Sequence, residues 1–200
     1  MLAACRLLDE EGSAGFSMAK LGQRLGVTAM ALYRHVEDRD DLEQAILDHT
    51  LADLVLDEHP DDDWERGVAR WMHAVHDHWV RHPWIGALIR GERHSLSPSW
   101  LTALGRLAAV LQRAGLTTDE VARELTQISR VVVGVTMLEV RAPLPQVDAF
   151  GPDTLERLAP PERARWEALA PELVRYGNEV LFDDLVAQTI DRIRTRTRRR

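Results

Sequence analysis

The sequence of 200 residues contains one cysteine, Cys5, which excludes an intramolecular disulfide and a cysteine-based zinc finger. It has no apolar run long enough to cross a membrane, and its start lacks the basic segment and apolar centre of a signal peptide. We therefore expect a soluble, cytoplasmic protein without membrane contact. Cys5 falls on the apolar side of the first expected helix, which favours a buried structural thiol.

Motifs of catalysis are also missing, since the sequence has no glycine-rich phosphate loop, no HExxH motif and no recognisable pairing of a nucleophile with a base. We expect no enzyme, no catalytic residues and no cofactor. Histidines at positions 73, 76, 78 and 82 have helical spacings that could suit a metal. Because no companion ligands accompany them, pocket lining or plain surface explains them better, and we expect no metal site. An enzyme that uses this cluster is the alternative, with Asp77, Glu92 or Glu139 as its acid or base.

Acidic residues outnumber basic ones by 32 to 25, which gives a net charge of -7. This excess of negative charge disfavours DNA binding if the chain is taken as a whole. The distribution matters more than the sum. Residues 17–39 carry a small positive excess, with Lys20, Arg24, Arg34 and Arg39 against Glu37 and Asp38. So small an excess implies few phosphate contacts per subunit, and dimerisation would then be needed for useful affinity.

Residues 17–36 predict two short helices joined by a turn that contains glycine. Ser17 is a good N-cap for the first helix, and Thr28 for the second, which we expect over 28–36. Gly26 suits the left-handed conformation that closes a helix. The first helix buries one face, made by Met18, Leu21 and Leu25. Two short helices with such a turn describe a helix-turn-helix, although an ordinary helix corner would have the same spacing.

The second of these helices would expose a surface suited to a DNA groove. Alanine and methionine can touch thymine methyl groups, while tyrosine and histidine can reach phosphates or base edges. We expect Tyr33, His35 and Arg39 to contact phosphates. Base edges would be sampled by Ala29, Met30 and Arg34.

A set of motifs in this region resembles the DNA-binding domain of the TetR family of bacterial transcriptional regulators. They are Gly12, Phe16-Ser17-Met18, Leu21-Gly22, Leu25-Gly26-Val27, Ala31-Leu32-Tyr33-Arg34-His35-Val36 and Arg39-Asp40-Asp41-Leu42. The LYxHV ending is similar to the tetracycline-repressor-like branch. The resemblance implies an all-α homodimer, with a three-helix helix-turn-helix domain over 1–48 and a helical ligand-binding and dimerisation domain over 49–200. The DNA-binding residues we expect are Ser17, Lys20, Thr28, Ala29, Met30, Tyr33, Arg34, His35 and Arg39.

The rest of the chain shows helical periodicity and no strand pattern. Expected helices are 1–11, 39–58, 64–81, 83–90, 98–115, 118–141, 162–169 and 178–194, and five prolines make 143–161 a broken loop. The helices 118–141 and 178–194 carry wider apolar faces than a monomer needs. Pairing them across a two-fold axis in a four-helix bundle would bury the surplus.

Tryptophan is over-represented among the aromatic residues, with six Trp against three Phe and two Tyr. Large rings with one polar atom suit an apolar cavity for a small molecule, although core packing would also explain them. The ligand-binding residues we expect are Trp71, His73, Val75, His76, Trp79, Trp84, Leu88, Trp100, Leu104 and Gln127. The sequence thus predicts a repressor that an apolar or aromatic effector releases from a palindromic double-stranded DNA operator. A helical adaptor or metal-binding protein that has lost operator binding is the alternative.

Overall fold

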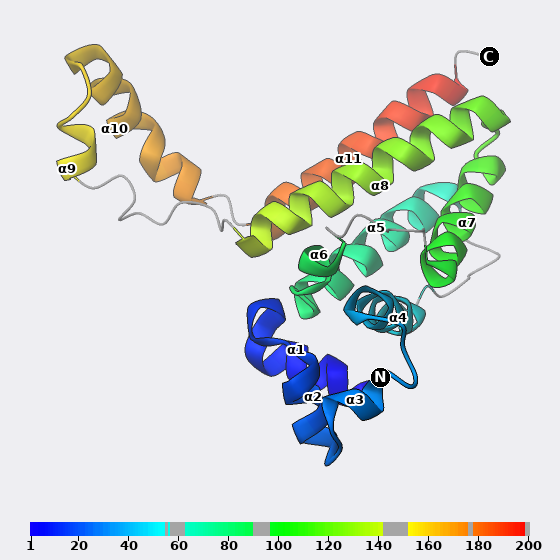
Figure 1. Ribbon diagram of the computed structural model, residues 1–200. Helices are drawn as coiled ribbons and strands as arrows, with labels where there is room; N and C mark the ends of the chain where they lie inside the picture. The colour runs from blue at the N-terminus through cyan, green and yellow to red at the C-terminus, as the bar shows by residue number, and fades with distance from the viewer. Residues whose placement is uncertain (55, 57–62, 90–96, 142–151, 176–177, 199–200) are drawn as a thin grey trace. The chain divides into compact units, whose positions relative to one another are not determined.

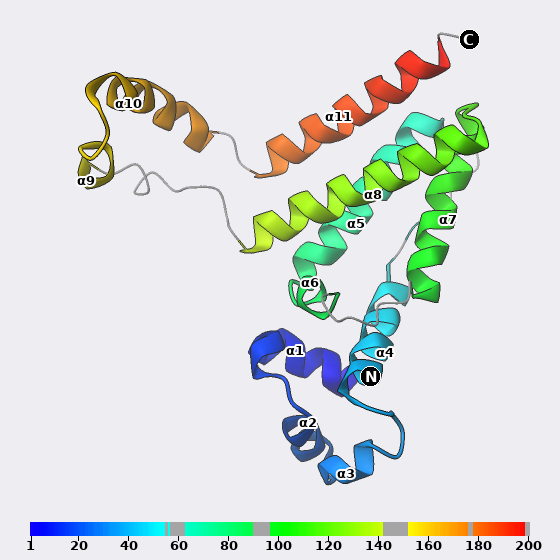
Figure 2. The same cartoon turned by 45° about the horizontal axis from the view of Figure 1, so that its top comes forward.

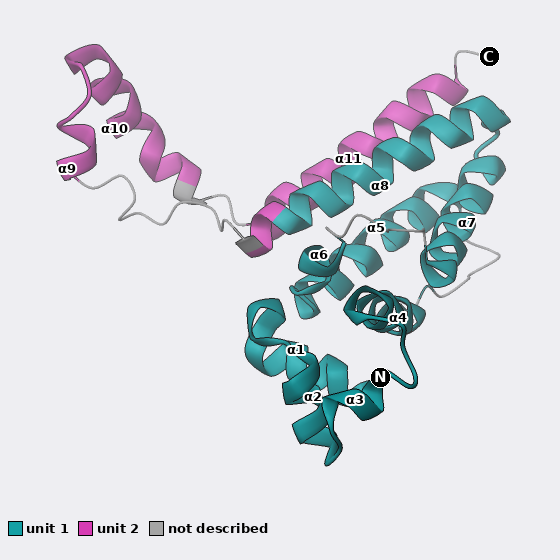
Figure 3. Ribbon diagram, in the orientation of Figure 1, with its two compact units in different colours: residues 1–137 teal, residues 138–200 magenta. Residues whose placement is uncertain are grey.

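A computed structural model describes residues 1–54, 56, 63–89, 97–141, 152–175 and 178–198, without the side chains of residues 141, 174 and 175. The described residues form helices α1 to α11 and no strand (Figure 1), which confirms the all-α prediction. They divide into two compact units, 1–137 and 138–200 (Figure 3). The domain boundary expected after residue 48 stays a prediction. No helix in the described part is both long and apolar enough to cross a membrane.

Helix α1 (Leu2–Gly15) is interrupted at Gly12, whose φ of 67° and ψ of 176° are not helical. The sequence predicted a helix end here, and the chain instead continues for one more short turn after a kink. Ala4, Leu7 and Leu8 are buried, whereas Met1 and Leu2 are exposed. Cys5 is half-buried, with its Sγ 3.7 Å from Thr50 Oγ1, so the thiol that was predicted to be buried is covered only in part.

Helices α2 (Met18–Leu25) and α3 (Ala29–Leu32) begin at the predicted caps. Ser17 Oγ accepts a hydrogen bond from the Lys20 amide at 3.2 Å, and Thr28 Oγ1 accepts one from the Ala31 amide at 3.3 Å. Gly26 closes α2 in the left-handed conformation, with φ 69° and ψ 27°. These local signals confirm the two helices and the turn between them.

Helix α3 is shorter than the predicted 28–36. Beyond Leu32 the chain turns tightly, because the Arg34 and His35 amides bond the carbonyls three residues back, at 3.4 and 2.8 Å. The turn delivers the chain to Asp38, whose Oδ1 accepts from the Asp41 amide at 2.8 Å and caps the next helix. Residues 33–37 therefore connect the two helices, because a longer α3 would leave too few residues to reach the Asp38 cap of α4.

Helix α4 (Arg39–Ala52) also ends earlier than its prediction, which reached residue 58. The Asp53 and Leu54 amides bond carbonyls three residues back, at 3.2 and 3.1 Å, which tightens the last turn and stops the helix. Residues 55 and 57–62 lie outside the described part. The buried face of α4 contains Leu42, Ile46, Leu47, Thr50 and Leu51.

The rest of the first unit contains α5 (Trp64–Arg81), α6 (Ile85–Leu88), α7 (Pro98–Arg113) and α8 (Thr118–Arg141). Figures 1 and 2 show α1, α2 and α3 together at one end of this unit, with α4 leading from them towards α5, α6 and α7. Helix α7 packs on both α4 and α5. Helix α6 covers only part of the predicted 83–90, of which Arg90 lies outside the description.

In the second unit, α10 (Pro160–Arg175) is longer than the predicted 162–169, and α11 (Asn178–Thr197) extends three residues beyond its prediction. Prolines 160 and 161 stand in the first turn of α10, where their missing N–H groups have no helical partner to lose. Helix α9 (Pro152–Leu155) lies within the predicted loop 143–161, so that prediction was wrong for these residues. Residues 142–151 lie outside the described part.

We expect Thr117→Ala to lower the free energy of unfolding by about 1 kcal/mol. Thr117 and Glu120 form a capping box at the start of α8, in which the Glu120 carboxylate accepts from the Thr117 amide at 2.8 Å, and Thr117 Oγ1 accepts from the Glu120 amide at 3.4 Å. Urea unfolding measures the loss. The exposed neighbour variant Thr118→Ala is the control, and equal losses in both variants would contradict the role of the cap.

Candidate nucleic-acid interface

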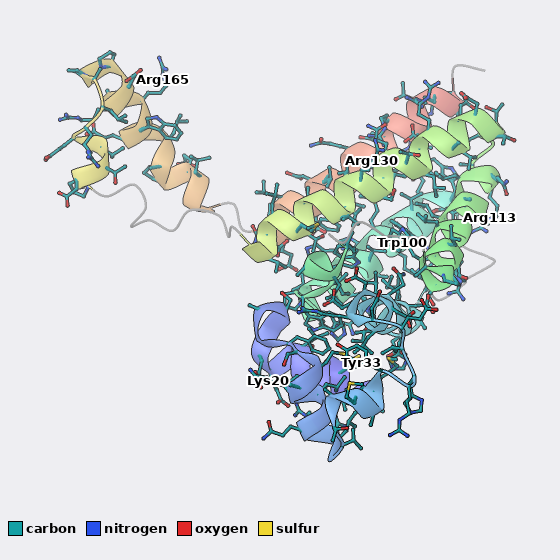
Figure 4. The ribbon with its side chains drawn as sticks, viewed as in Figure 1. Lys20, Tyr33, Trp100, Arg113, Arg130 and Arg165 are labelled. Atoms are coloured by element: carbon teal, nitrogen blue, oxygen red, sulfur yellow. The ribbon has the colours of Figure 1, made fainter. Side chains whose placement is uncertain are left out.

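Four apolar side chains are exposed around α3, and we call them the α3 face: Leu25, Val27, Met30 and Tyr33. The prediction that Leu25 is buried with Met18 and Leu21 was wrong, because Leu25 is the last residue of α2 and is 48% exposed. Met30 is the most exposed at 73%, and Tyr33 is 43% exposed. Figure 4 shows the Tyr33 side chain at the α1–α3 end of the first unit. Burying these side chains against a partner would be favourable, because exposed apolar area is costly in water.

The predicted contacts Arg34, His35 and Arg39 are exposed beside the α3 face. Arg39 Nε lies 2.6 Å from Glu43 Oε1, and the Arg39 guanidinium lies 5.9 Å from the centre of the Phe16 ring. These two contacts restrict the Arg39 side chain, and the Glu43 carboxylate would share its charge with a phosphate. Ala29 is half-buried, so less of its surface than of the Met30 surface is available to a DNA base.

Ion pairs between α1 and α2 engage two cations of the predicted positive patch. Arg24 Nη2 lies 2.6 Å from Glu10 Oε1, and Lys20 forms an ion pair with Glu11. The hydrogen bond from Arg24 lowers the pKa of the Glu10 carboxyl, and the same bond raises the pKa of Arg24. Sequence reasoning missed both glutamates, because their partners are 9 and 14 residues away and only the fold brings them together.

The two capping hydroxyls, Ser17 and Thr28, accept backbone hydrogen bonds through their oxygens. Each hydroxyl keeps one O–H, which can donate to an acceptor outside the protein. Both residues start helices whose first amides carry partial positive charge. The caps therefore place two O–H donors at helix ends that favour an anion such as a DNA phosphate.

The predicted ligand-binding residues differ in burial. Trp71, Val75, Trp79, Trp84 and Leu88 are buried, while His73, His76, Trp100 and Leu104 are half-buried. The Trp71 ring lies 5.9 Å from the Trp100 ring, with an angle of 45° between their planes, and Trp71 Nε1 donates to the Ala103 carbonyl at 2.8 Å. Gln127 is exposed on α8, so the structure does not bring it into this buried set.

Unused hydrogen-bonding capacity remains inside this region. Trp79 Nε1 is buried and makes no hydrogen bond to the described residues. The expected ligand set left out His78, which is fully buried on the same helix and whose two ring nitrogens have no hydrogen-bond partner in the described part. Burial, followed by the charges of His82 and Arg81, lowers the pKa of His78 to about 4. Among the described residues, no three histidine, cysteine, aspartate or glutamate side chains could hold a metal ion together.

Two family models match the chain. Residues 1–46 match the model described as bacterial regulatory proteins of the tetR family, and residues 56–173 match the model of the tetracyclin repressor-like C-terminal domain. A crystal structure of a possible TetR family transcriptional regulator from Streptomyces coelicolor A3(2) is 28% identical. The superposition of the two structures covers 97% of this chain and 96% of the Streptomyces coelicolor chain, with a TM-score of 0.79.

Curated relatives agree over shorter stretches. An HTH-type transcriptional regulator of Saccharopolyspora erythraea is 30% identical over 137 residues, which are 68% of this chain and 58% of the relative. The HTH-type transcriptional repressor DrrR1 of Streptomyces coeruleorubidus is 28% identical over 138 residues, or 66% and 49% of the two chains. The chain thus spans about half to three fifths of these relatives. The C-terminal model alone covers more than half of the chain, and the chain belongs to the tetR family of bacterial regulatory proteins.

Proposed function

We propose that this protein is a DNA-binding transcriptional regulator that responds to a small molecule, and that it represses until an apolar or aromatic effector releases it from a palindromic operator. The observation that carries the proposal is the α3 face, an exposed apolar surface flanked by cations on a helix-turn-helix. Among its relatives, DrrR1 is named a repressor, which supports this direction of control. A regulator of this kind acts in the cytoplasm, where its operator is.

In this proposal α3 and the turn after it enter the major groove of double-stranded DNA. Met30 has the exposure needed to reach thymine methyl groups, and the exposed Arg34 would read base edges. Tyr33, His35 and Arg39 then bind phosphates and set the register. Lys20 would share its charge between Glu11 and a phosphate, so it contributes less than a solvated lysine would.

Two features support a homodimer. The small positive excess of residues 17–39 gives few phosphate contacts per subunit, and the long helices expose apolar side chains. Val135 and Leu138 are exposed on α8, and Val180 and Leu181 on α11. Pairing the helices 118–141 and 178–194 with those of a second copy would bury them. Two copies would present their α3 helices to successive major grooves, about 34–36 Å apart.

The effector would bind among the tryptophans of α5, of α7 and of the segment between α5 and α6. The buried indole N–H of Trp79 has no hydrogen-bond partner in the described part, so it can donate to a polar group of the ligand. Trp71 is less available, because its N–H already bonds the Ala103 carbonyl. An effector with a large apolar body and one acceptor fits this set, and its binding would be coupled reciprocally to DNA binding.

We expect Tyr33→Ala to weaken operator binding by about tenfold without lowering dimer stability, because it removes one exposed contact at the centre of the interface. The measurement is a fluorescence-anisotropy titration against the DNA upstream of the gene, at two salt concentrations. Leu101→Ala is the control, since Leu101 is an exposed apolar residue on α7, outside the proposed sites.

Wild-type protein should show saturable, salt-sensitive binding at a palindromic site. Weak binding that is equal for every sequence would overturn the proposed function and favour the adaptor instead. Unchanged affinity of Tyr33→Ala, with specific binding by the wild type, would remove only Tyr33 from the interface.

A further inference from the structure

A single carboxylate joins α1 to the segment between α5 and α6. Asp9 Oδ1 accepts a hydrogen bond from Trp84 Nε1 at 2.6 Å, and the same oxygen lies 3.5 Å from His82 Nδ1. Asp9 is 73 residues from His82 and 75 from Trp84 in the sequence. We call these three residues the Asp9 joint.

The joint continues into the protein interior. The His82 ring lies 5.6 Å from the Trp84 ring and 5.0 Å from the ring of the buried His78. The carbonyl of Thr50, on α4, lies near His78 and favours its protonated form. Helices α1, α4 and α5 and the segment between α5 and α6 therefore meet around three neighbouring rings, whose planes are tilted by 59° and 60° to one another. The carboxylate that contacts the outer two rings belongs to α1.

Helices α2 and α3 connect to the rest of the first unit by two routes. One is the continuous chain into α4, and the other is α1, which packs on both α2 and α4. A hydrogen bond to a charged acceptor is short and directional, so it restrains rotation more than an apolar contact of similar size. With the joint closed, α1 cannot turn about α4 without breaking the bond between Asp9 and Trp84.

We propose that Asp9 is a positioning residue for operator recognition: through Trp84 and His82 it holds the helix-turn-helix at the angle that sets the distance between the two α3 helices of a dimer. The proposal rests on the proposed function and adds a determinant of operator spacing to it. Because Trp84 also belongs to the expected ligand set, an effector that displaced its indole would release the same joint.

Operator spacing is the property that separates positioning from simple stability. Inserting one base pair at the centre of a palindrome moves the half-sites apart by about 3.4 Å. A rigid joint should reject this operator, whereas a loosened joint should accept it at lower cost. A variant that merely unfolds a fraction of the protein would weaken binding to every operator by the same factor.

The experiment compares wild type, Asp9→Ala, Trp84→Phe and the double variant on two duplexes, the palindrome and its version with one inserted base pair. Wild type should prefer the palindrome by about 100-fold, and each variant should prefer it by about tenfold. The double variant should resemble the single ones, because either change opens the same bond. Asp153→Ala, which removes an exposed carboxylate on α9, should keep the wild-type preference.

Each outcome bears on a different statement. If wild type discriminates between the duplexes and both joint variants discriminate equally well, Asp9 has no positioning role and the proposed function stands. If wild type binds no duplex specifically, the proposed function fails and the role of Asp9 fails with it. Circular dichroism checks folding, and where Asp9→Ala does not fold, Trp84→Phe alone carries the comparison, because phenylalanine cannot donate the hydrogen bond to Asp9.

Discussion

We expect Gly22→Val to weaken the proposed specific operator binding by about 10- to 100-fold while leaving the remainder of the protein folded. A Cβ atom at this position would lie 2.8 Å from the Val27 carbonyl oxygen, 3.2 Å from the Ala29 nitrogen and 3.3 Å from the Thr28 carbonyl carbon. All three are backbone atoms, so no flexible side chain can move aside. The two γ-methyl groups of valine would add to the overlap.

The turn between α2 and α3 cannot open to make room without a further loss. The Gly22 carbonyl accepts a hydrogen bond from the Val27 amide at 2.9 Å, and this bond holds the chain against α2 at the crossing. Overpacking of this kind costs about 1–3 kcal/mol. Because α3 has only four residues and one side-chain cap, that cost falls on the least stable helix of the interface.

The matched control is Gly105→Val. Gly105 lies within α7, and a Cβ atom there would meet nothing within 4 Å, so the same chemical change creates no overlap. Anisotropy titration measures operator affinity, and thermal unfolding followed by circular dichroism reports on the folded body. Operator affinity of Gly22→Val within twofold of wild type would show that the turn tolerates a side chain, contrary to this geometry.

Local signals account for most of what the sequence predicted correctly in the helix-turn-helix. Ser17, Thr28 and Asp38 each cap a helix through an atom three residues ahead, and Gly26 closes α2 alone. Such features need only the neighbouring residues, so a sequence pattern can identify them. The sequence prediction placed the end of α3 too late, at residue 36. The actual end depends on where α4 begins, and the helix propensity of residues 28–36 carries no information about that position.

Contacts between distant segments explain what sequence reasoning could not find in the candidate site. The pairs of Arg24 with Glu10 and of Trp84 with Asp9 join side chains that no periodicity relates. Periodicity did place Trp71 and Trp79 on the buried face of α5. It could not tell that the indole N–H of Trp71 bonds the Ala103 carbonyl, which depends on the packing of α5 against α7.

Acid should weaken the protein through His78, and we expect about 3 kcal/mol of stability to be lost between pH 6.5 and pH 4. Burial, with the charges of His82 and Arg81, lowers the pKa of this imidazole from 6.5 to about 4 against the opposing influence of the Thr50 carbonyl and Asp53. In the unfolded chain His78 therefore takes up a proton below pH 6.5, whereas in the folded protein it does so only below about pH 4. The contribution of neutral His78 is complete above pH 6.5, falls through this window and changes no further below it.

His78→Phe isolates this contribution, because phenylalanine fills a similar ring volume and cannot take up a proton. The Thr50 carbonyl near His78 already accepts a hydrogen bond from the Asp53 amide at 3.2 Å, so the substitution leaves it with a partner. Urea unfolding at pH 7 and pH 4 should show wild type losing about 3 kcal/mol more than the variant. Equal losses in the two proteins would mean that another group carries the acid sensitivity. If phenylalanine strains the site, His78→Leu gives the same comparison, since the proton uptake depends on the imidazole and not on the shape that replaces it.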